Sequence, residues 1–330
     1  MNAIRQLLAK KIEKLTPSGF EALALEVFRY QAQYNSLYAN YLQLLNIQPK
    51  NVTKVENIPF LPIQFFKNHI IKTGEWTAQT VFTSSGTTER TTSKHWVRDL
   101  DFYLQNTKKG FEYFFGNLKK YCIIALLPAY LERSNSSLVA MADYFIRSSN
   151  HAESGFFLYN TDELVKLLKV VKQYQTPTIL LGVTFALLDL AEQYPMDLNG
   201  IMIMETGGMK GRRRELIRDE VHQILGEAFN VSPIYSEYGM TELFSQAYAI
   251  NNGKFQSSPT LRVFGRQVND PLSPEHNGKT AALNFIDLAN LDTISFIATD
   301  DIGKINNVNS YEVHGRLDAS DLRGCNLMVQ

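Results

Sequence analysis

The chain has 330 residues, of which 45% are hydrophobic and 12% aromatic; this composition suits a packed core and excludes a disordered chain. Its 33 basic and 33 acidic residues cancel, so bulk charge gives no support for a nucleic-acid or membrane-surface partner. The apolar run YCIIALLPAYL is shorter than the roughly 20 residues of a membrane span, the amino end lacks a secretory apolar block, and two cysteines form no disulfide framework. We expect a soluble, cytoplasmic protein with one large or two moderate domains and no membrane span.

The first 48 residues have the apolar spacing of helices. Ser18-Gly-Phe-Glu21 has the spacing of a capping box and predicts a helix start, with Leu23 and Val27 on the face that follows. In the next segment, NIPFLPIQFFK, Pro59 and Pro62 break the helical pattern and predict an extended chain.

Short apolar runs alternate with helical patterns between residues 121 and 239. Strands are predicted at 121–128, 155–159, 176–183, 200–205 and 232–239, and helices at 136–149, 161–174, 185–194 and 212–229. Such alternation predicts an α/β fold with a mainly parallel sheet covered on both faces. Beyond residue 250 the helical patterns stop, and strands are predicted at 260–268, 279–288, 293–300 and 310–315.

Hydroxyl side chains are concentrated in FTSSGTTERTTSKHW, residues 82–96. Backbone N–H groups of small residues, hydroxyls and the Lys94 ammonium suit the oxygens of a phosphate group. The alternative is a polar surface turn. The stretch is not a Walker A loop, because no G-x-x-x-x-G-K-[ST] occurs in the chain.

Three further segments follow predicted strands. The first, ETGGMKG (205–211), has paired glycines that allow a flat ligand to approach the backbone. The second, YGMTE (238–242), offers a ring, a hydroxyl and a carboxylate at a sheet edge. The third, TDDIG (299–303), offers a carboxylate for a ribose diol at a strand terminus. Each segment taken alone is equally compatible with an ordinary turn or loop.

The order of these segments, ending in Gly315-Arg316-Leu317-Asp318, resembles the adenylate-forming (ANL) superfamily of acyl and aryl ligases. The segments IPFLPIQFFK, GGMKGRRRE, YGMTELFSQAYA and GRLDASDLRGCNLMV are similar to the LuxE-type acyl-protein synthetases within the wider phenylacetate-ligase-like group. The resemblance covers residues 55–330. It implies a core domain over residues 1–312, with a helical segment at 1–50, a short hinge-like tail at 313–330, and no full carboxyl-terminal lid domain.

The resemblance also implies a site for ATP and Mg²⁺. The phosphate loop would consist of Ser84, Ser85, Gly86, Thr87, Thr88 and Lys94. The adenine would lie against Gly207, Gly208 and Met209, and Tyr238 would stack on it beside Gly239 and Met240.

Four more matching residues would complete that site. Thr241 would meet the phosphate, and Glu242 would bind both phosphate and Mg²⁺. Asp301 would hold the ribose hydroxyls, and Arg316 would meet the ribose or phosphate near the hinge at Asp318.

Some residues depart from the family pattern. Glu89 stands where the phosphate loop usually has glycine, Lys94 lies further along than usual, and Asp300 stands where the ribose motif usually has glycine. The lysine that the usual lid supplies has no counterpart here, so the group that replaces it is unassigned.

The two cysteines have different expected roles. Cys122 lies in an apolar run and is expected in the core. Cys325 falls where LuxE-type enzymes carry an acyl-accepting thiol, and the alternative is a buried structural thiol. His95, His151 and His314 lack metal-ligand spacing and are expected to be surface or packing residues.

The sequence thus predicts activation of a carboxylic acid, with a fatty acid as the expected substrate, by ATP and transfer of the acyl group to a protein thiol. The expected acceptor is an acyl-carrier or reductase protein. Two alternatives stay open: an acyltransferase that takes a pre-activated thioester, and a non-catalytic module that binds a nucleotide or an acyl carrier. The intact Thr241, Glu242 and Asp301 favour nucleotide chemistry over mere docking.

Overall fold

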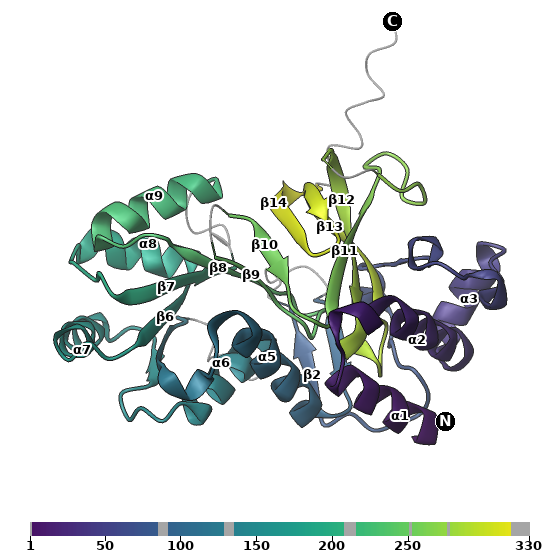
Figure 1. The fold of residues 1–330 in the computed structure, drawn as a ribbon, viewed down its shortest axis with the longest axis horizontal. Helices are drawn as coiled ribbons and strands as arrows, with labels where there is room; N and C mark the ends of the chain where they lie inside the picture. The colour runs from purple at the N-terminus through teal and green to yellow at the C-terminus, as the bar shows by residue number, and fades with distance from the viewer. Residues whose placement is uncertain are drawn as a thin grey trace, which may run out of the picture. The chain divides into compact units, whose positions relative to one another are not determined.

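The structure is a computed structural model, and it describes residues 2–84, 92–128, 135–207, 216–250, 253–275 and 278–317. The fold divides into two compact units, coloured along the chain in Figure 1. The N/C unit contains Met1–Glu75 and Thr260–Gln330, and the central unit contains Trp76–Pro259. The boundary expected at residue 312 stays a prediction, because most of the tail lies outside the described residues.

The central unit is built on a mainly parallel sheet. Its parallel strands, in the spatial order β5-β4-β6-β7-β8, are Gly155–Phe157, Cys122–Leu126, Thr178–Val183, Ile201–Thr206 and Tyr235–Tyr238. Two short antiparallel strands, β9 (Ala247–Ala249) and β10 (Phe255–Ser257), extend the sheet beyond β8. The predicted parallel sheet is therefore confirmed, and β9 and β10 are additions that the sequence analysis missed.

Helices cover both faces of this sheet. They are α5 (Leu100–Phe115), α6 (Ser137–Ser148), α7 (Thr161–Gln173), α8 (Thr184–Gln193) and α9 (Arg218–Phe229), with a 3-10 turn, η4, at Leu118–Lys120. Figure 1 shows α8 and α9 on one side and α5 and α6 on the other. A helix was predicted over residues 212–229. Of its described part, residues 216 and 217 are not helical, and α9 begins at Arg218.

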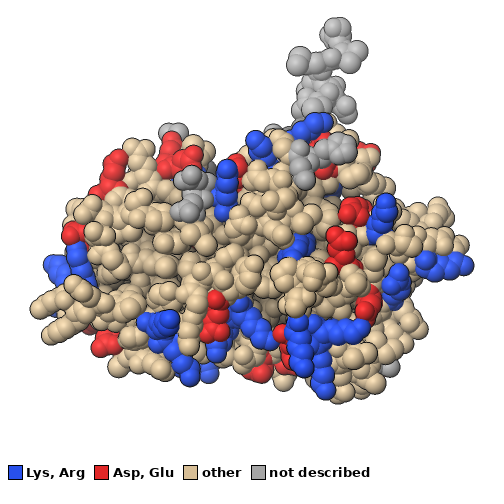
Figure 2. All heavy atoms as spheres, in the orientation of Figure 1, with Lys and Arg blue, Asp and Glu red and all other residues tan. Residues whose placement is uncertain are grey.

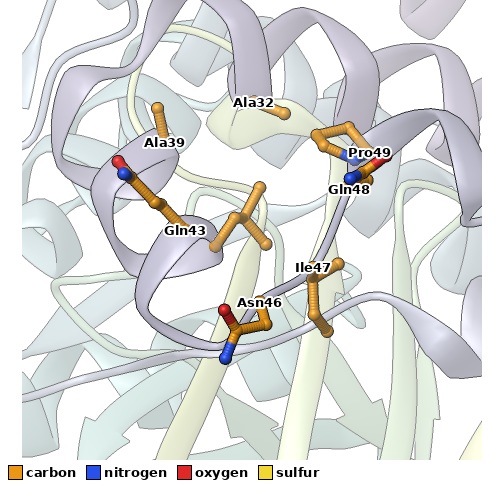
Figure 3. Close-up of a pocket in the computed structure, with 8 residues that line it drawn as sticks. Ala32, Ala39, Gln43, Asn46, Ile47, Gln48 and Pro49 are labelled. Atoms are coloured by element: carbon orange, nitrogen blue, oxygen red, sulfur yellow. The ribbon is translucent and has the colours of Figure 1, made fainter.

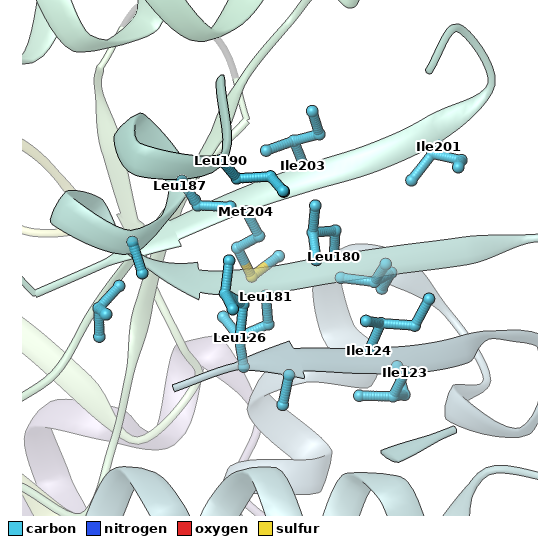
Figure 4. Close-up of a cluster of buried hydrophobic side chains, with 14 of the residues drawn as sticks. Ile123, Ile124, Leu126, Leu180, Leu181, Leu187, Leu190, Ile201, Ile203 and Met204 are labelled. Carbon is cyan, nitrogen blue, oxygen red and sulfur yellow. The ribbon is translucent and has the colours of Figure 1, made fainter. Parts of the chain in front are cut away.

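Apolar side chains from β4, β6 and β7 pack against these helices. Figure 4 shows Ile124, Leu180 and Ile203 on neighbouring strands, with Leu187 and Leu190 of α8 beside them. Burial of such side chains contributes about 1.5–3 kcal/mol each. The near-continuous apolar runs that predicted these strands therefore reflect burial on both faces of the sheet.

The N/C unit combines amino-terminal helices with an antiparallel sheet. Its elements before the sheet are α1 (Asn2–Glu13), α2 (Phe20–Tyr34), α3 (Ser36–Leu44), α4 (Phe65–Asn68) and the 3-10 turns η1 (Pro17–Gly19), η2 (Pro49–Asn51) and η3 (Val55–Asn57). The sheet has the order β11-β12-β13-β14, with strands Leu261–Arg266, Thr280–Asp287, Phe296–Asn307 and Ser310–Arg316, and a 3-10 turn, η5, at Leu288–Asn290.

Two predictions for the amino-terminal half need correction. The capping box at Ser18 does not form: α2 begins at Phe20 with Gly19 as its N-cap and no side-chain cap bond, because Pro17 starts a 3-10 turn through this segment. The segment with two prolines is extended at Ile58 and at β1 (Leu61–Pro62), which pairs in parallel with β13; the prediction is wrong only for the end of the segment, where α4 follows.

Buried polar contacts attach α1 and α2 to the segment between β12 and β13. Arg5 Nη2 lies 2.6 Å from Asp292 Oδ2, and the two side chains are 12% and 9% exposed. Gln31 Nε2 donates to the carbonyls of Asn290 (3.0 Å) and Leu291 (3.1 Å). Buried backbone carbonyls need such donors, so these bonds help to fix α2 against this segment.

Charged side chains of both signs are interspersed over the face in Figure 2. No helix among the described residues is long and apolar enough to span a bilayer.

Candidate functional site

The hydroxyl-rich stretch lies where β2 (Thr80–Thr83) and β3 (Lys94–Val97) pair as antiparallel strands in the central unit. Ser84 N donates to Ser93 O (3.1 Å), and Ser93 N donates to Ser84 Oγ (2.9 Å), which joins the two ends of the connection. Lys94 is exposed on β3, opposite Thr83. The predicted phosphate-loop residues Ser85, Gly86, Thr87 and Thr88, with Glu89, lie outside the described residues.

The YGMTE segment begins at the end of β8, as the sequence predicts. The Tyr238 ring is 9% exposed and packs against Phe255, with ring centroids 5.6 Å apart. Leu243 N donates to Met240 O (3.2 Å), so the chain turns directly after the strand. Glu242 is 7% exposed. The contact between the two rings is tilted at 55°, and stacking of Tyr238 on a purine stays a prediction.

His95 of β3 contacts the same segment. Its Nδ1 lies 2.8 Å from the carbonyl oxygen of Thr241, and its ring stacks on Phe244 with centroids 4.4 Å apart. Burial lowers the pKa of His95 to about 4, and the bond to Thr241 opposes that shift only partly. The ring is thus neutral at pH 7, and Nδ1 carries the proton because a carbonyl only accepts. Alternation in Lys94-His95-Trp96-Val97 could have shown that His95 points inward.

A cluster of charged and polar side chains, which the sequence analysis missed, surrounds Glu205 at the end of β7. Glu205 is 4% exposed and accepts hydrogen bonds from Thr184 Oγ1 (2.8 Å) and Arg218 Nε (3.3 Å). Burial alone raises the pKa of Glu205, but His222, the charge of Arg218, Ser236 and Thr184 together lower it. The carboxylate is therefore ionised, with an arginine as its counter-ion.

Ser236, His222 and Glu205 resemble a hydrolytic triad by composition but not by geometry. His222 Nε2 lies 3.0 Å from Ser236 Oγ and 3.8 Å from Glu205 Oε1. A triad needs the carboxylate at the opposite ring nitrogen from the serine. Ser236 is also fully buried, so we assign this cluster to positioning of α9 against β7 and β8.

The opposite face of the sheet carries a second carboxyl group. Glu237 is 6% exposed and accepts a short hydrogen bond from Thr206 Oγ1. The pKa of Glu237 is raised to about 7, and burial is the largest cause. The hydrogen bond from Thr206 opposes this shift, and the charge of Glu205 adds to it. Glu205 pairs with Ser236 in the β7–β8 register, and Thr206 pairs with Glu237, so the two carboxyl groups point to opposite faces.

In the N/C unit the predicted ribose residues lie on neighbouring strands. Asp301 and Arg316 are register partners on β13 and β14, and Arg316 Nε donates to Asp301 Oδ1 (2.8 Å). Asp301 is 5% exposed. It was expected at a strand terminus, which is wrong: β13 continues to Asn307, with a register shift after Ile302.

Asp300, which departs from the family pattern, has structural partners of its own. Its Oδ1 accepts from Gln64 Nε2 (2.6 Å), and its carbonyl accepts from Leu317 N (2.7 Å). A glycine could make the second contact but not the first. The side chain thus attaches the start of α4 to β13, next to Asp301.

The remaining predicted residues are divided between described and undescribed parts. Gly207 follows β7 with a φ of 73°, a conformation that favours glycine. Cys122 is fully buried on β4, and burial raises the pKa of its thiol, which confirms the core assignment. Gly208, Met209, Asp318 and Cys325 lie outside the described residues.

A groove of about 450 Å³ lies in the N/C unit, between α2, α3 and the turn at Pro49 (Figure 3). Leu42, Gln43, Asn46 and Ile47 line it, and none of its lining residues is charged or nucleophilic. It contains none of the predicted nucleotide-binding residues. Among the described residues no group of three or more His, Cys, Asp and Glu side chains could hold a metal ion.

No model of a known protein family matches the sequence, and no curated protein matches it. Solved structures match the fold. An open conformation of 2-hydroxyisobutyryl-CoA ligase, in complex with 2-HIB-AMP and CoA, aligns with a TM-score of 0.65 at 12% identity, covering 91% of this chain and 70% of that chain.

Two other solved structures match a smaller part of the chain. Apo MatB from Rhodopseudomonas palustris aligns with a TM-score of 0.52 at 14% identity, covering 72% of this chain and 47% of that chain. O-succinylbenzoate coenzyme A synthetase (MenE) from Bacillus subtilis, in complex with AMP, aligns with a TM-score of 0.51 at 14% identity. The alignment covers 74% of this chain and 62% of that chain. The chain therefore has the mixed α/β fold of the adenylate-forming ligases.

Proposed function

We propose that the protein activates a carboxylic acid with ATP as an acyl-adenylate. The observation that carries this proposal is the pairing of Thr206 with Glu237, which brings the Gly207 turn and the YGMTE segment to the same edge of the central sheet. Ligands of open α/β folds bind at the carboxyl ends of parallel strands. The fold shared with ligases solved with AMP or an AMP adduct supports the same reaction class.

In the proposed reaction an oxygen of the carboxylate attacks the α-phosphorus of ATP. The bond from that phosphorus to the bridging oxygen breaks, and pyrophosphate leaves with the electron pair. Negative charge develops on the phosphate oxygens, so nearby hydrogen-bond donors and cations stabilise the transition state. In the central unit, Ser84, the Thr241 hydroxyl and the exposed Lys94 ammonium supply such groups.

Glu242 is the proposed ligand of Mg²⁺. Mg²⁺ binds through one or two carboxylates together with substrate phosphates and water, so one nearly buried carboxylate fits an ion that arrives with ATP. When bound, the ion would neutralise charge on the phosphates.

Asp301 in the N/C unit is the proposed acceptor of the ribose hydroxyls. Its carboxylate already accepts from Arg316, whose side chain is 72% exposed. A carboxylate can accept from several donors, so the contact with Arg316 is compatible with hydrogen bonds from a ribose diol. Arg316 would thereby lie beside the same sugar.

The acyl group would then pass to a thiol. The thiolate attacks the acyl carbonyl carbon, the bond to the adenylate oxygen breaks, and AMP leaves with the electron pair. By the resemblance to LuxE-type enzymes we propose Cys325 as the first acceptor, a fatty acid as the substrate and an acyl-carrier or reductase protein as the final acceptor. Cys122 is excluded as the acceptor by its complete burial.

A labelled-acid experiment tests both steps. We expect incubation with ATP, Mg²⁺ and a labelled fatty acid to leave a hydroxylamine-labile acyl group on the chain. Cys325→Ser should remove that label, because an alkoxide is far harder to generate than a thiolate near neutral pH, and Cys122→Ser should retain it. A label acquired only from a pre-activated thioester, without ATP, would instead identify an acyltransferase.

A further inference from the structure

A hydrogen bond on the central sheet connects two of the proposed nucleotide-binding segments. Thr206 is the last residue of β7 and directly precedes Gly207; Glu237 directly precedes Tyr238 on β8. Thr206 Oγ1 donates to Glu237 Oε2, and the two residues are 3% and 6% exposed. The bond thus joins the two strand ends where the chain leaves the sheet.

The other oxygen of the Glu237 carboxyl group contacts the start of the YGMTE turn. A Cβ atom placed on Gly239 would lie 2.7 Å from Glu237 Oε1, closer than real Cβ contacts allow. The backbone at Gly239 therefore lies close to the end of the Glu237 side chain. One carboxyl group accordingly bonds to the end of β7 and lies beside the turn after β8.

Burial of this carboxyl group is unfavourable by itself. Tyr248 is the register partner of Glu237 on β9, Gln246 lies against Gly239, and the two residues are 1% and 4% exposed. Within the described parts of the chain, the Tyr248 hydroxyl and Gln246 Oε1 have no hydrogen-bond partner. Apolar side chains of similar size often replace buried polar groups with no loss of stability. A stability role alone therefore gives a poor account of Glu237, whereas a defined geometry of two segments requires a directional bond.

We propose that Glu237 and Thr206 are positioning residues, which together hold the Gly207 turn and the Tyr238–Glu242 segment in the geometry needed to bind ATP. The effect on catalysis rests on the proposed function. The effect on the geometry of the segments does not, because it follows from the contacts of the ligand-free protein.

Two pairs of variants test the bond. Thr206→Val and Glu237→Ala remove it, while Thr206→Ser and Glu237→Gln retain a donor and an acceptor. Tyr248→Phe is the matched control, since it removes a hydroxyl on the same face without touching the bond. If Glu237→Ala does not fold, Glu237→Met removes the acceptor at a similar volume.

Two measurements are made on each folded variant: amide hydrogen exchange of residues 239–242 without ligand, and kcat and KM for ATP in pyrophosphate exchange. Loss of one hydrogen bond corresponds to about a tenfold change in an equilibrium. We expect the two bond-removing variants to lose about tenfold in amide protection and in kcat/KM, and Thr206→Ser, Glu237→Gln and Tyr248→Phe to stay within about threefold of the wild type. The combined variant Thr206→Val with Glu237→Ala should lose no more amide protection and no more kcat/KM than either single variant, because both substitutions remove the same bond.

A purely structural bond gives a different result. The bond-removing variants would then melt at lower temperature, yet retain wild-type amide protection in residues 239–242, and that outcome overturns the proposal. If the wild type shows no pyrophosphate exchange at all, the proposed function fails, and the amide protection still decides whether Glu237 and Thr206 hold the segment.

Discussion

The buried Glu237 predicts how the stability of the fold depends on pH. Its pKa is about 7 in the folded protein against 4.5 for an ordinary glutamate, and burial is the main cause. Between these two values the folded state binds one more proton than the unfolded state, so stability falls as pH rises. A difference of 2.5 pKa units corresponds to about 3 kcal/mol. The contribution of Glu237 to the unfolding free energy is therefore fully present below pH 4.5 and is lost as pH rises through 7.

His95 has the opposite effect over an overlapping range. Burial lowers its pKa from 6.5 to about 4, so the unfolded state binds the additional proton between those values. His95 therefore contributes about 3 kcal/mol above pH 6.5 that is lost as pH falls towards 4. Between pH 4.5 and 6.5 the two slopes cancel, and these two groups give the wild type a nearly flat profile there.

Glu237→Gln separates the two effects, because the amide keeps an acceptor for Thr206 and does not titrate. We expect the unfolding free energy of the variant, minus that of the wild type, to increase by about 3 kcal/mol between pH 4.5 and 8. Urea denaturation at half-unit pH steps measures it. A flat difference for Glu237→Gln would refute the assignment of a buried, high-pKa carboxyl group.

Three further predictions concern other parts of the molecule. Glu242→Gln should leave the melting temperature nearly unchanged and reduce adenylate formation by about 10²-fold or more, as for loss of one electrostatic stabiliser; normal activity would mean that YGMTE is only a loop. Asp301→Ala should raise KM for ATP by about tenfold through lost ribose bonds, measured by initial rates, and an unchanged KM would remove Asp301 from the site. Arg5→Ala should lower the unfolding free energy by about 2 kcal/mol, because Asp292, which is 9% exposed, then loses the ion pair with Arg5. An unfolding free energy equal to that of the wild type, measured by urea denaturation, would contradict this prediction.

The strands of the central sheet could be predicted because burial on both faces produces apolar runs, as in Cys122–Leu126 and Thr178–Val183. Helix α5 was missed. Its Gly110 and the polar residues Asn106 and Thr107 obscure the helical pattern, yet all three are buried, with Asn106 bonded to the Phe244 carbonyl. Tertiary contacts satisfy these polar groups, and no local pattern reveals such partners.

The candidate site shows a similar division. Motif order made Gly207, Tyr238, Glu242 and Asp301 candidates from the sequence alone, because their chemistry is concentrated in short segments, and their roles stay predictions. The cluster around Glu205 has no such signature. Thr184, Arg218 and His222 reach it from α8 and α9, and only the parallel register of the strands brings them together.

The central claim is that the protein forms an acyl-adenylate, and exchange of labelled pyrophosphate into ATP tests it most directly. The account predicts exchange that requires both a carboxylic acid and Mg²⁺, across a panel of short, long and aromatic acids. Cys325→Ser should leave this exchange nearly unchanged, because activation precedes transfer to the thiol. Absence of acid-dependent exchange with every acid in the panel, in a protein that is folded by its melting transition, would contradict the account.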